Sequence, residues 1–168
     1  MKILNRQQIR GADAFTIENE PISSVDLMER AGRACAHRIA SLIPADDQVL
    51  ILCGMGNNGG DGMVIADMLR KEKRKVDVRV IRHAEDRSQD QQHFADKTPW
   101  SYLNGVDELE KILSSKTIWI IDAILGSGQD RPLGGLLKEC VKTVNDSPHP
   151  VIAVDIPTGL MTDGSDMD

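Results

Sequence analysis

The sequence predicts an α/β protein in which helices cover a parallel sheet. Short apolar runs alternate with segments of helical periodicity, and polar or glycine-rich loops follow the apolar runs. A length of 168 residues is typical of one domain, and right-handed crossovers are the usual way to join elements in this order. We therefore expect a single domain over residues 1–168, with ligands bound beyond the carboxyl ends of the strands.

The first long helix is predicted at residues 24–42, where apolar side chains recur at helical spacing. Ser23 or Ser24 is suited to cap its first turn, and Pro44 follows its end. Apolar runs predict strands at 49–53, 76–81, 117–122 and 151–155. Helical patterns lie at about 62–73, 89–95, 106–113 and 133–144.

Charge and composition exclude several classes of function. The formal net charge is −6, whereas binding to nucleic acid or to an anionic membrane as the main activity needs a basic surface. The N-terminus has no apolar stretch of the length that a secretory signal needs. Cys35, Cys53 and Cys140 are widely spaced and odd in number, which favours buried free thiols. We expect a cytoplasmic protein with no nucleic-acid or membrane partner.

The loop at residues 54–62 joins a predicted strand to a predicted helix, and five of its nine residues are glycine. Glycines allow close backbone approach, and the N–H groups of the helix start attract phosphate. Asn57, Asn58 and Asp61 add oxygen ligands suited to a cation beside that phosphate. The alternative is a turn that only connects strand and helix.

A formal G-x-G-x-x-G pattern lies within this loop, at Gly54, Gly56 and Gly59. An ordinary NAD site also has an acidic residue near the end of the second strand, to bind the ribose hydroxyls. This chain has Arg79 and Arg82 there instead. These arginines, in place of an acidic residue, therefore argue against an ordinary dehydrogenase.

Two further predicted strands end in carboxylates, at Asp122 and Asp155. A carboxylate at the end of an apolar strand is costly unless it is paired or binds a metal. The loop after Asp122 contains Gly-Ser-Gly, and the loop after Asp155 adds the hydroxyl of Thr158. Each carboxylate could instead cap backbone amides of its own loop. We predict that the three loops converge on one pocket.

Four motifs resemble the YjeF N-terminal domain family, the NAD(P)H-hydrate epimerases. They lie in the family's order at residues 27–32 (LMERAG), 54–62, 122–133 and 155–159, and they span nearly the whole chain. The resemblance implies a Rossmann-like three-layer α/β/α sandwich with a mainly parallel sheet. It also implies interconversion of the R and S forms of NADHX and NADPHX, the cofactors hydrated at nicotinamide C6, in nicotinamide-nucleotide repair.

The resemblance also implies the site residues. A potassium ion is expected on Asn58, Asp122 and Thr158, an all-oxygen set that suits a hard cation. Thr158 replaces the family's usual serine, and Gln129 replaces an apolar residue. We assign the proton transfer at C6 to Asp155 as the catalytic residue. Substrate contacts are expected from Asn57, Asn58, Gly59, Gly60, Asp61, Gly126, Ser127, Gly128, Gln129, Asp130, Arg131, Pro132 and Asp155.

The remaining implications concern partners. The functional partner is an ADP- or ATP-dependent NAD(P)H-hydrate dehydratase, which a longer chain could carry as a fused domain. Family domains continue past the proline-glycine loop, so we expect this chain to be truncated at its C-terminus. The family often forms homodimers, for which Leu27 and Met28 are candidate contacts. Two alternatives stay open: a non-catalytic nucleotide-binding or scaffold module of the same fold, and a phosphosugar or nucleotide enzyme of another Rossmann-like family. Surface or packing roles are expected for His37, His83, His93 and His149.

Overall fold

The computed structural model describes residues 4–114 and 118–161. These residues form a five-stranded sheet of order β3-β2-β1-β4-β5, and every neighbouring pair is parallel. The strands are β1 (Gln48–Cys53), β2 (Lys75–Val80), β3 (Ser101–Tyr102), β4 (Ile118–Ala123) and β5 (Val151–Ala153). The helices are α1 (Arg6–Asn19), α2 (Ser24–Leu42), α3 (Asn57–Lys71), α4 (Gln89–Ala95), α5 (Val106–Leu113) and α6 (Gly135–Asp146).

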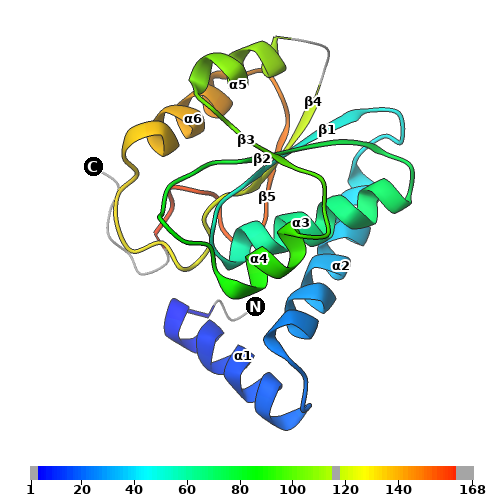
Figure 1. The fold of residues 1–168 in the computed structure, drawn as a ribbon, viewed down its shortest axis with the longest axis vertical. Coiled ribbons are helices and arrows are strands. Elements are labelled where there is room, and N and C mark those ends of the chain that lie inside the picture. The colour runs from blue at the N-terminus through cyan, green and yellow to red at the C-terminus, as the bar shows by residue number, and fades with distance from the viewer. Residues whose placement is uncertain (1–3, 115–117, 162–168) are drawn as a thin grey trace.

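Helices cover both faces of the sheet, which confirms the predicted three-layer α/β architecture (Figure 1). Successive side chains of β1 point to opposite faces, so that this central strand contributes to two cores. Val49, Ile51 and Cys53 belong to the core with α2, α3 and α4. Leu50 and Leu52 belong to the core with α5 and α6. Burial on both faces explains why β1 is a continuous apolar run in the sequence.

Helix α2 has the bounds predicted from its periodicity, and Ser23 caps it. The Ser23 Oγ accepts the Asp26 N–H at 3.1 Å, and the Asp26 carboxylate accepts the Ser23 N–H in return. Gly32 lets α2 approach α3 closely, because a Cβ at this position would lie 2.7 Å from Val64 Cβ. Part of the LMERAG motif is therefore a packing requirement.

Helix α3 begins at Asn57, five residues before the predicted start at Gly62. Glycines have low helix propensity, and for this reason the sequence pattern did not predict the first turns of α3. The prediction of a loop over residues 54–62 is therefore wrong from Asn57 onward: the amide pair and Asp61 lie on the first turns of a helix. Likewise, α6 begins at Gly135 and not at Leu133, because Pro132, Gly134 and Gly135 delay its first turn.

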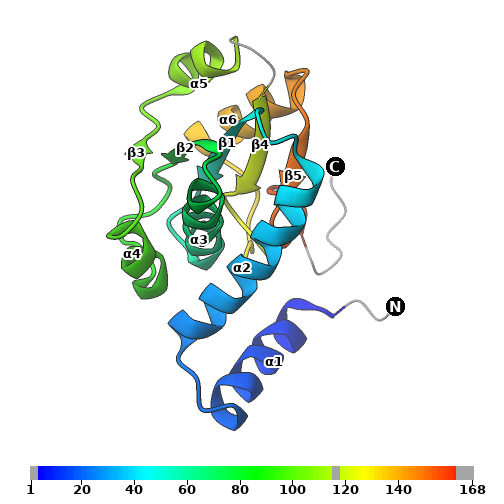
Figure 2. The same ribbon diagram turned by 90° about the vertical axis from the view of Figure 1, so that its right-hand side faces the viewer.

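Two elements were not predicted. Helix α1 buries none of its residues, so it has no strong apolar stripe, although Asn5 and Gln8 form a capping box at its start. It packs beside α2, outside the three layers (Figure 2). Strand β3 is two residues long, too short for a recognisable alternation. Thr117, the first residue of one predicted strand, lies outside the described residues.

All three cysteines are free, as predicted, but only Cys53 and Cys140 are buried. The expectation that Cys35 is buried is wrong, because this residue of α2 faces the opening beyond the sheet. Within the described part of the chain, none of the helices combines the length and apolar character that crossing a bilayer requires.

Candidate functional site

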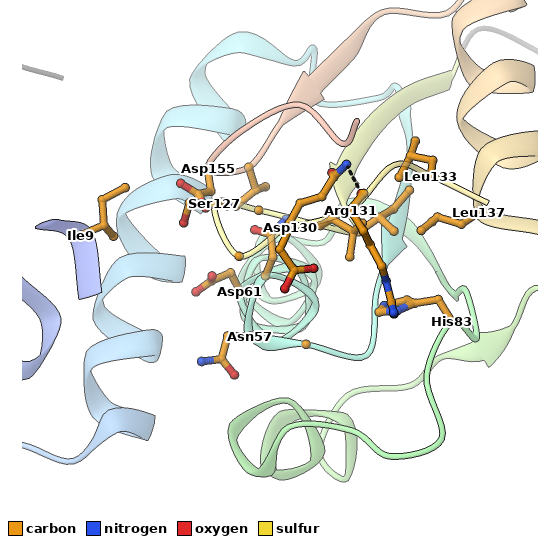
Figure 3. A pocket seen from close by; sticks show the side chains of 18 of the residues that line it. Ile9, Asn57, Asp61, His83, Ser127, Asp130, Arg131, Leu133, Leu137 and Asp155 are labelled. Atoms are coloured by element: carbon orange, nitrogen blue, oxygen red, sulfur yellow. Dashed lines mark hydrogen bonds between the residues drawn. The ribbon is translucent and has the colours of Figure 1, made fainter. Parts of the chain in front are cut away.

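A pocket of about 1000 Å³ lies beyond the carboxyl ends of the strands, where parallel sheets bind ligands. Its walls come from the start of α3, from the loop after β4, and from Val154 and Asp155 after β5 (Figure 3). Helix α1 adds Ile9, Arg10 and Asp13. The convergence of three strand-end loops is therefore confirmed.

The start of α3 leaves backbone N–H groups without a side-chain cap, a geometry that suits an anion. Its N-cap residue, Gly56, supplies no side-chain cap, so the N–H groups of the first turn are available to a ligand such as a phosphate. Gly59 is required here, because a Cβ at this position would overlap the carbonyl oxygen of Gly54. A residue with a side chain would push the helix start away from β1.

Asp122 and Thr158 form a hydrogen-bonded pair that joins the loops after β4 and β5. The Thr158 hydroxyl donates to Asp122 Oδ1 at 2.7 Å, and the Thr158 N–H donates to Asp122 Oδ2 at 2.8 Å. The hydroxyl oxygen also accepts the Leu125 N–H at 3.0 Å. Asp122 additionally accepts the Ile124 N–H of its own loop at 3.2 Å, so it caps backbone amides as the alternative interpretation expected.

Asn58 is a buried amide without a hydrogen-bond partner in the part of the chain that the structure describes. Its side-chain oxygen and nitrogen are both buried, and neither has a partner among the described residues. An unsatisfied buried polar group costs about 1–3 kcal/mol, which points to a ligand that completes this side chain. Asn58 lies against Gly126, since a Cβ built there would be 3.3 Å from Asn58 Cγ. Leu125, which binds Thr158, is the adjacent residue.

Asp155 adopts a backbone conformation that few residues with a side chain tolerate, with φ at +65°. Aspartate is among the few residues that enter this region readily. In this conformation the carboxylate lines the pocket, and its Oδ2 accepts the Ser127 N–H at 2.6 Å. The side chain is therefore held at the pocket wall by the loop after β4.

Asp61 is a second carboxylate in the same pocket, on the first turns of α3 (Figure 3). Burial raises the pKa of Asp61 to about 7, and the negative charges of Asp155 and Asp13 add to the effect. Burial and the charge of Asp155 also raise the pKa of Asp13. Near neutral pH, a substantial fraction of Asp61 therefore carries a proton.

His83 is a pocket residue to which the sequence analysis gave only a surface or packing role. Its Nε2 accepts the Met55 N–H at 3.0 Å. Burial lowers the pKa of His83, and the charge of Arg131 lowers it further, which favours the neutral ring that this bond requires. Its position just after β2 could have indicated a pocket role, because ligands bind beyond the carboxyl ends of parallel strands. No comparable feature of the sequence indicated that α1 contributes residues to the pocket.

The structure separates the predicted site residues into two groups. The pocket is lined by Asn57, Asn58, Asp61, Gly126, Ser127, Gly128, Gln129, Asp130, Arg131, Pro132 and Asp155. Gly59, Gly60, Asp122 and Thr158 are not among the residues that line it. Gln129 lines it, but its side chain is engaged within the protein, because it accepts the Gly159 N–H and donates to the Arg131 carbonyl. That arrangement accounts for a polar residue at this buried position.

Comparisons with known proteins agree with this architecture. A protein from Limosilactobacillus fermentum named NAD(P)H-hydrate epimerase is 39% identical over 159 residues, which cover 93% of this chain and 74% of that protein. A Salinibacter ruber protein named bifunctional NAD(P)H-hydrate repair enzyme Nnr is 33% identical over 96% of this chain and 33% of its own length.

Among solved structures, the crystal structure of the yeast protein ynu0, YNL200c, superposes with a TM-score of 0.81 and 25% identity. The superposition covers 100% of this chain and 75% of the yeast chain. The family described as YjeF-related protein N-terminus matches residues 24–168. The match begins at α2 and includes all three strand-end loops. The chain therefore belongs to the YjeF-related N-terminal family.

Proposed function

We propose that this protein is an NAD(P)H-hydrate epimerase, which interconverts the R and S forms of NADHX and NADPHX at nicotinamide C6. The observation that carries the proposal is the pair of carboxylates, Asp155 and Asp61, in one pocket beside the uncapped start of α3. The start of α3 suits the phosphates of a dinucleotide, and the carboxylates suit proton transfer at the reacting carbon. Relatives named NAD(P)H-hydrate epimerase support the same assignment.

The chemistry needs only loss and return of water. C6 of the hydrate is bonded to both the ring nitrogen and a hydroxyl group, so departure of a protonated hydroxyl leaves an iminium-like cation. Return of water from the other face gives the opposite epimer. The carboxylate of Asp155 stabilises that cation and accepts the proton of the returning water.

Asp61 is suited to the complementary role of proton donor. Its pKa of about 7 keeps a proton available to the departing hydroxyl near neutral pH. Two carboxylates whose surroundings set different protonation states are a recurrent way to divide acid and base roles. Here burial raises the pKa of Asp61, which suits the acid role, and Asp155 lies exposed at the pocket wall, where it can meet water as the base.

Asn58, Asp122 and Thr158 are the residues that would hold a potassium ion. Their donors are an amide, a carboxylate and a hydroxyl, which suit a hard cation, and the buried amide of Asn58 lacks any other described partner. Asn58 and Thr158 also meet the loop after β4 at the adjacent residues Gly126 and Leu125. A bound potassium ion would supply positive charge beside Asp122 and would hold the loops in fixed relative positions.

The cellular setting is part of the proposal. The three free cysteines suit a reducing compartment such as the cytoplasm. An ADP- or ATP-dependent NAD(P)H-hydrate dehydratase is the expected functional partner. The Salinibacter ruber relative is named as a bifunctional repair enzyme, and this chain matches 33% of its length. That relationship supports a partner that acts on the same hydrates.

The direct test is chiral chromatography of enriched R-hydrate incubated with the protein, with and without potassium. Appearance of the S form above the spontaneous rate supports an epimerase, and dependence on potassium supports the ion site. No acceleration in either buffer would favour the binding module. Asp155→Asn should abolish the acceleration. The matched control is Asp146→Asn, which replaces an exposed carboxylate on α6 that pairs with Lys142 and should retain activity.

A further inference from the structure

Arg82 lines the pocket two residues beyond the end of β2. Asp155 lines it two residues beyond the end of β5. In the sheet order β3-β2-β1-β4-β5, strands β1 and β4 lie between these two strands. The two residues therefore mark opposite sides of one pocket, with the start of α3 between them.

Arg82 is held by an aromatic cluster. Its guanidinium lies 4.6 Å from the ring centroid of Tyr102. Arg87 donates to the Tyr102 hydroxyl at 3.0 Å, and its own guanidinium stacks 4.1 Å from the Trp100 ring. Hydrogen bonds from Arg87 and Arg82 lower the pKa of the Tyr102 phenol. Arg87 and Tyr102 thus act as positioning residues for Arg82.

The charge of Arg82 is not neutralised within the described chain. Among residues 4–114 and 118–161, no carboxylate forms an ion pair with Arg82 or Arg87. Arg79 lies on β2, shortly before Arg82 in the chain. Its guanidinium, in contrast, pairs with the carboxylates of Asp77 and Glu108. An exposed guanidinium with unused donors at a pocket wall is suited to an anion.

The loop that carries Arg82 is fixed to the anion site at α3. His83 accepts the Met55 N–H at 3.0 Å, and the Ser88 N–H donates to the Met55 carbonyl at 2.9 Å. Arg82 is therefore placed by the same segment that precedes the first turn of α3. A ligand bound at both places would meet a preorganised surface.

We propose that Arg82 binds the 2′-phosphate of the adenosine ribose, so that the protein prefers NADPHX to NADHX. This inference rests on the proposed function. If C6 lies at Asp155 and the pyrophosphate at the start of α3, the adenosine half extends toward the end of β2. In dinucleotide sites an acidic residue after the second strand binds the ribose hydroxyls, whereas an arginine accommodates a 2′-phosphate. Arg82 provides the second arrangement.

The kinetic test compares kcat/KM for enriched R-NADPHX and R-NADHX. Arg82→Ala should lower the value for NADPHX by about 10- to 100-fold, the loss expected for hydrogen bonds to a charged group, and leave NADHX unchanged. Arg82→Asp should make NADHX the better substrate. Arg33→Ala, which removes an exposed arginine of α2 paired with Glu29, is the control and should change neither value. Equal values for the two substrates in the unmodified protein, or equal losses in Arg82→Ala, would overturn the inference.

A binding test does not depend on the reaction. Calorimetry with adenosine 2′,5′-bisphosphate and with 5′-AMP should show tighter binding of the bisphosphate, and Arg82→Ala should remove the difference. Equal binding of the two nucleotides would refute the 2′-phosphate site even in an active epimerase. Selective binding by a protein that epimerises neither hydrate would instead retain the site and refute the proposed reaction.

Discussion

Substitution of Gly126 by alanine tests how the loop after β4 positions the proposed catalytic carboxylate. A Cβ at this position would overlap the Asp155 Oδ2 atom and would lie 3.3 Å from both Asp155 Cγ and Asn58 Cγ. The φ of Gly126 is not positive, so the backbone itself accepts alanine. The strain therefore falls on the Asp155 side chain, which must move by about 1 Å to reach van der Waals distance.

A displacement of this size should lower the reaction rate strongly and change the free energy of unfolding only slightly. A shift of about 1 Å in a catalytic group can lower the rate about 100-fold, equivalent to about 2.7 kcal/mol in the barrier. The Ser127 N–H bond to Asp155 would weaken, at a cost of about 1 kcal/mol. Reduced freedom of the unfolded chain offsets this by about 0.4–1 kcal/mol. Activity should fall while the melting temperature changes little.

The assay is the rate of R-to-S conversion followed by chiral chromatography, together with thermal unfolding. Gly105→Ala is the matched control, because a Cβ there meets nothing within 4 Å and the residue lies outside the pocket lining. It should retain full activity. Full activity in Gly126→Ala would refute the assignment of Asp155. A large loss of stability would instead refute the conclusion that the strain falls on the Asp155 side chain.

Substitutions at three further positions probe the candidate site. Asp155→Asn should lower kcat by about 10²- to 10⁴-fold with little change in KM, because the amide oxygen still accepts the Ser127 N–H; an unchanged kcat contradicts a role in proton transfer. The raised pKa of Asp61, about 7 against an ordinary 3.8, means that the folded state retains a proton that the unfolded state releases. The free energy of unfolding should therefore fall as pH rises from about 4 to about 7, and denaturant titrations of Asp61→Asn should lack this component of the fall; identical pH profiles would show that Asp61 is not protonated in the folded protein. In Thr158→Val, potassium should no longer raise the melting temperature, whereas Thr158→Ser keeps the hydroxyl and should retain the effect. An equal potassium effect in both variants would exclude this hydroxyl as a ligand.

The elements predicted correctly are those whose residues are buried in a regular pattern. The run Val49–Cys53 is buried on both faces, and its strand is observed with one added residue. Ser23, followed by helical periodicity, located the start of α2. These signals are local, since the capping bonds of Ser23 and the alternation of β1 depend on neighbouring residues in the chain.

The features that were missed depend on tertiary contacts. The glycines at the start of α3 have low intrinsic helix propensity, and they are helical because their small size lets α3 approach the sheet. Gly62 shows this, since a Cβ there would lie 2.7 Å from both Ala123 Cβ and Cys53 Sγ. The pocket role of His83 follows from its bond to Met55, which is 28 residues distant along the chain. No local pattern encodes that contact.

The loops after β4 and β5 are bonded to each other more than to the helices around them, and this explains why their residues should act as a unit. Thr158 bonds to Asp122 and Leu125, Asp155 accepts from Ser127, and Gln129 accepts from Gly159. A polar network of this kind fixes the proposed catalytic carboxylate with little freedom. Its energetics are therefore not additive. Combining Gly126→Ala with Thr158→Val should lower activity by less than the product of the two single effects. Thr158 anchors Leu125 in the loop whose Ser127 N–H holds Asp155, so both changes act on the position of the same carboxylate.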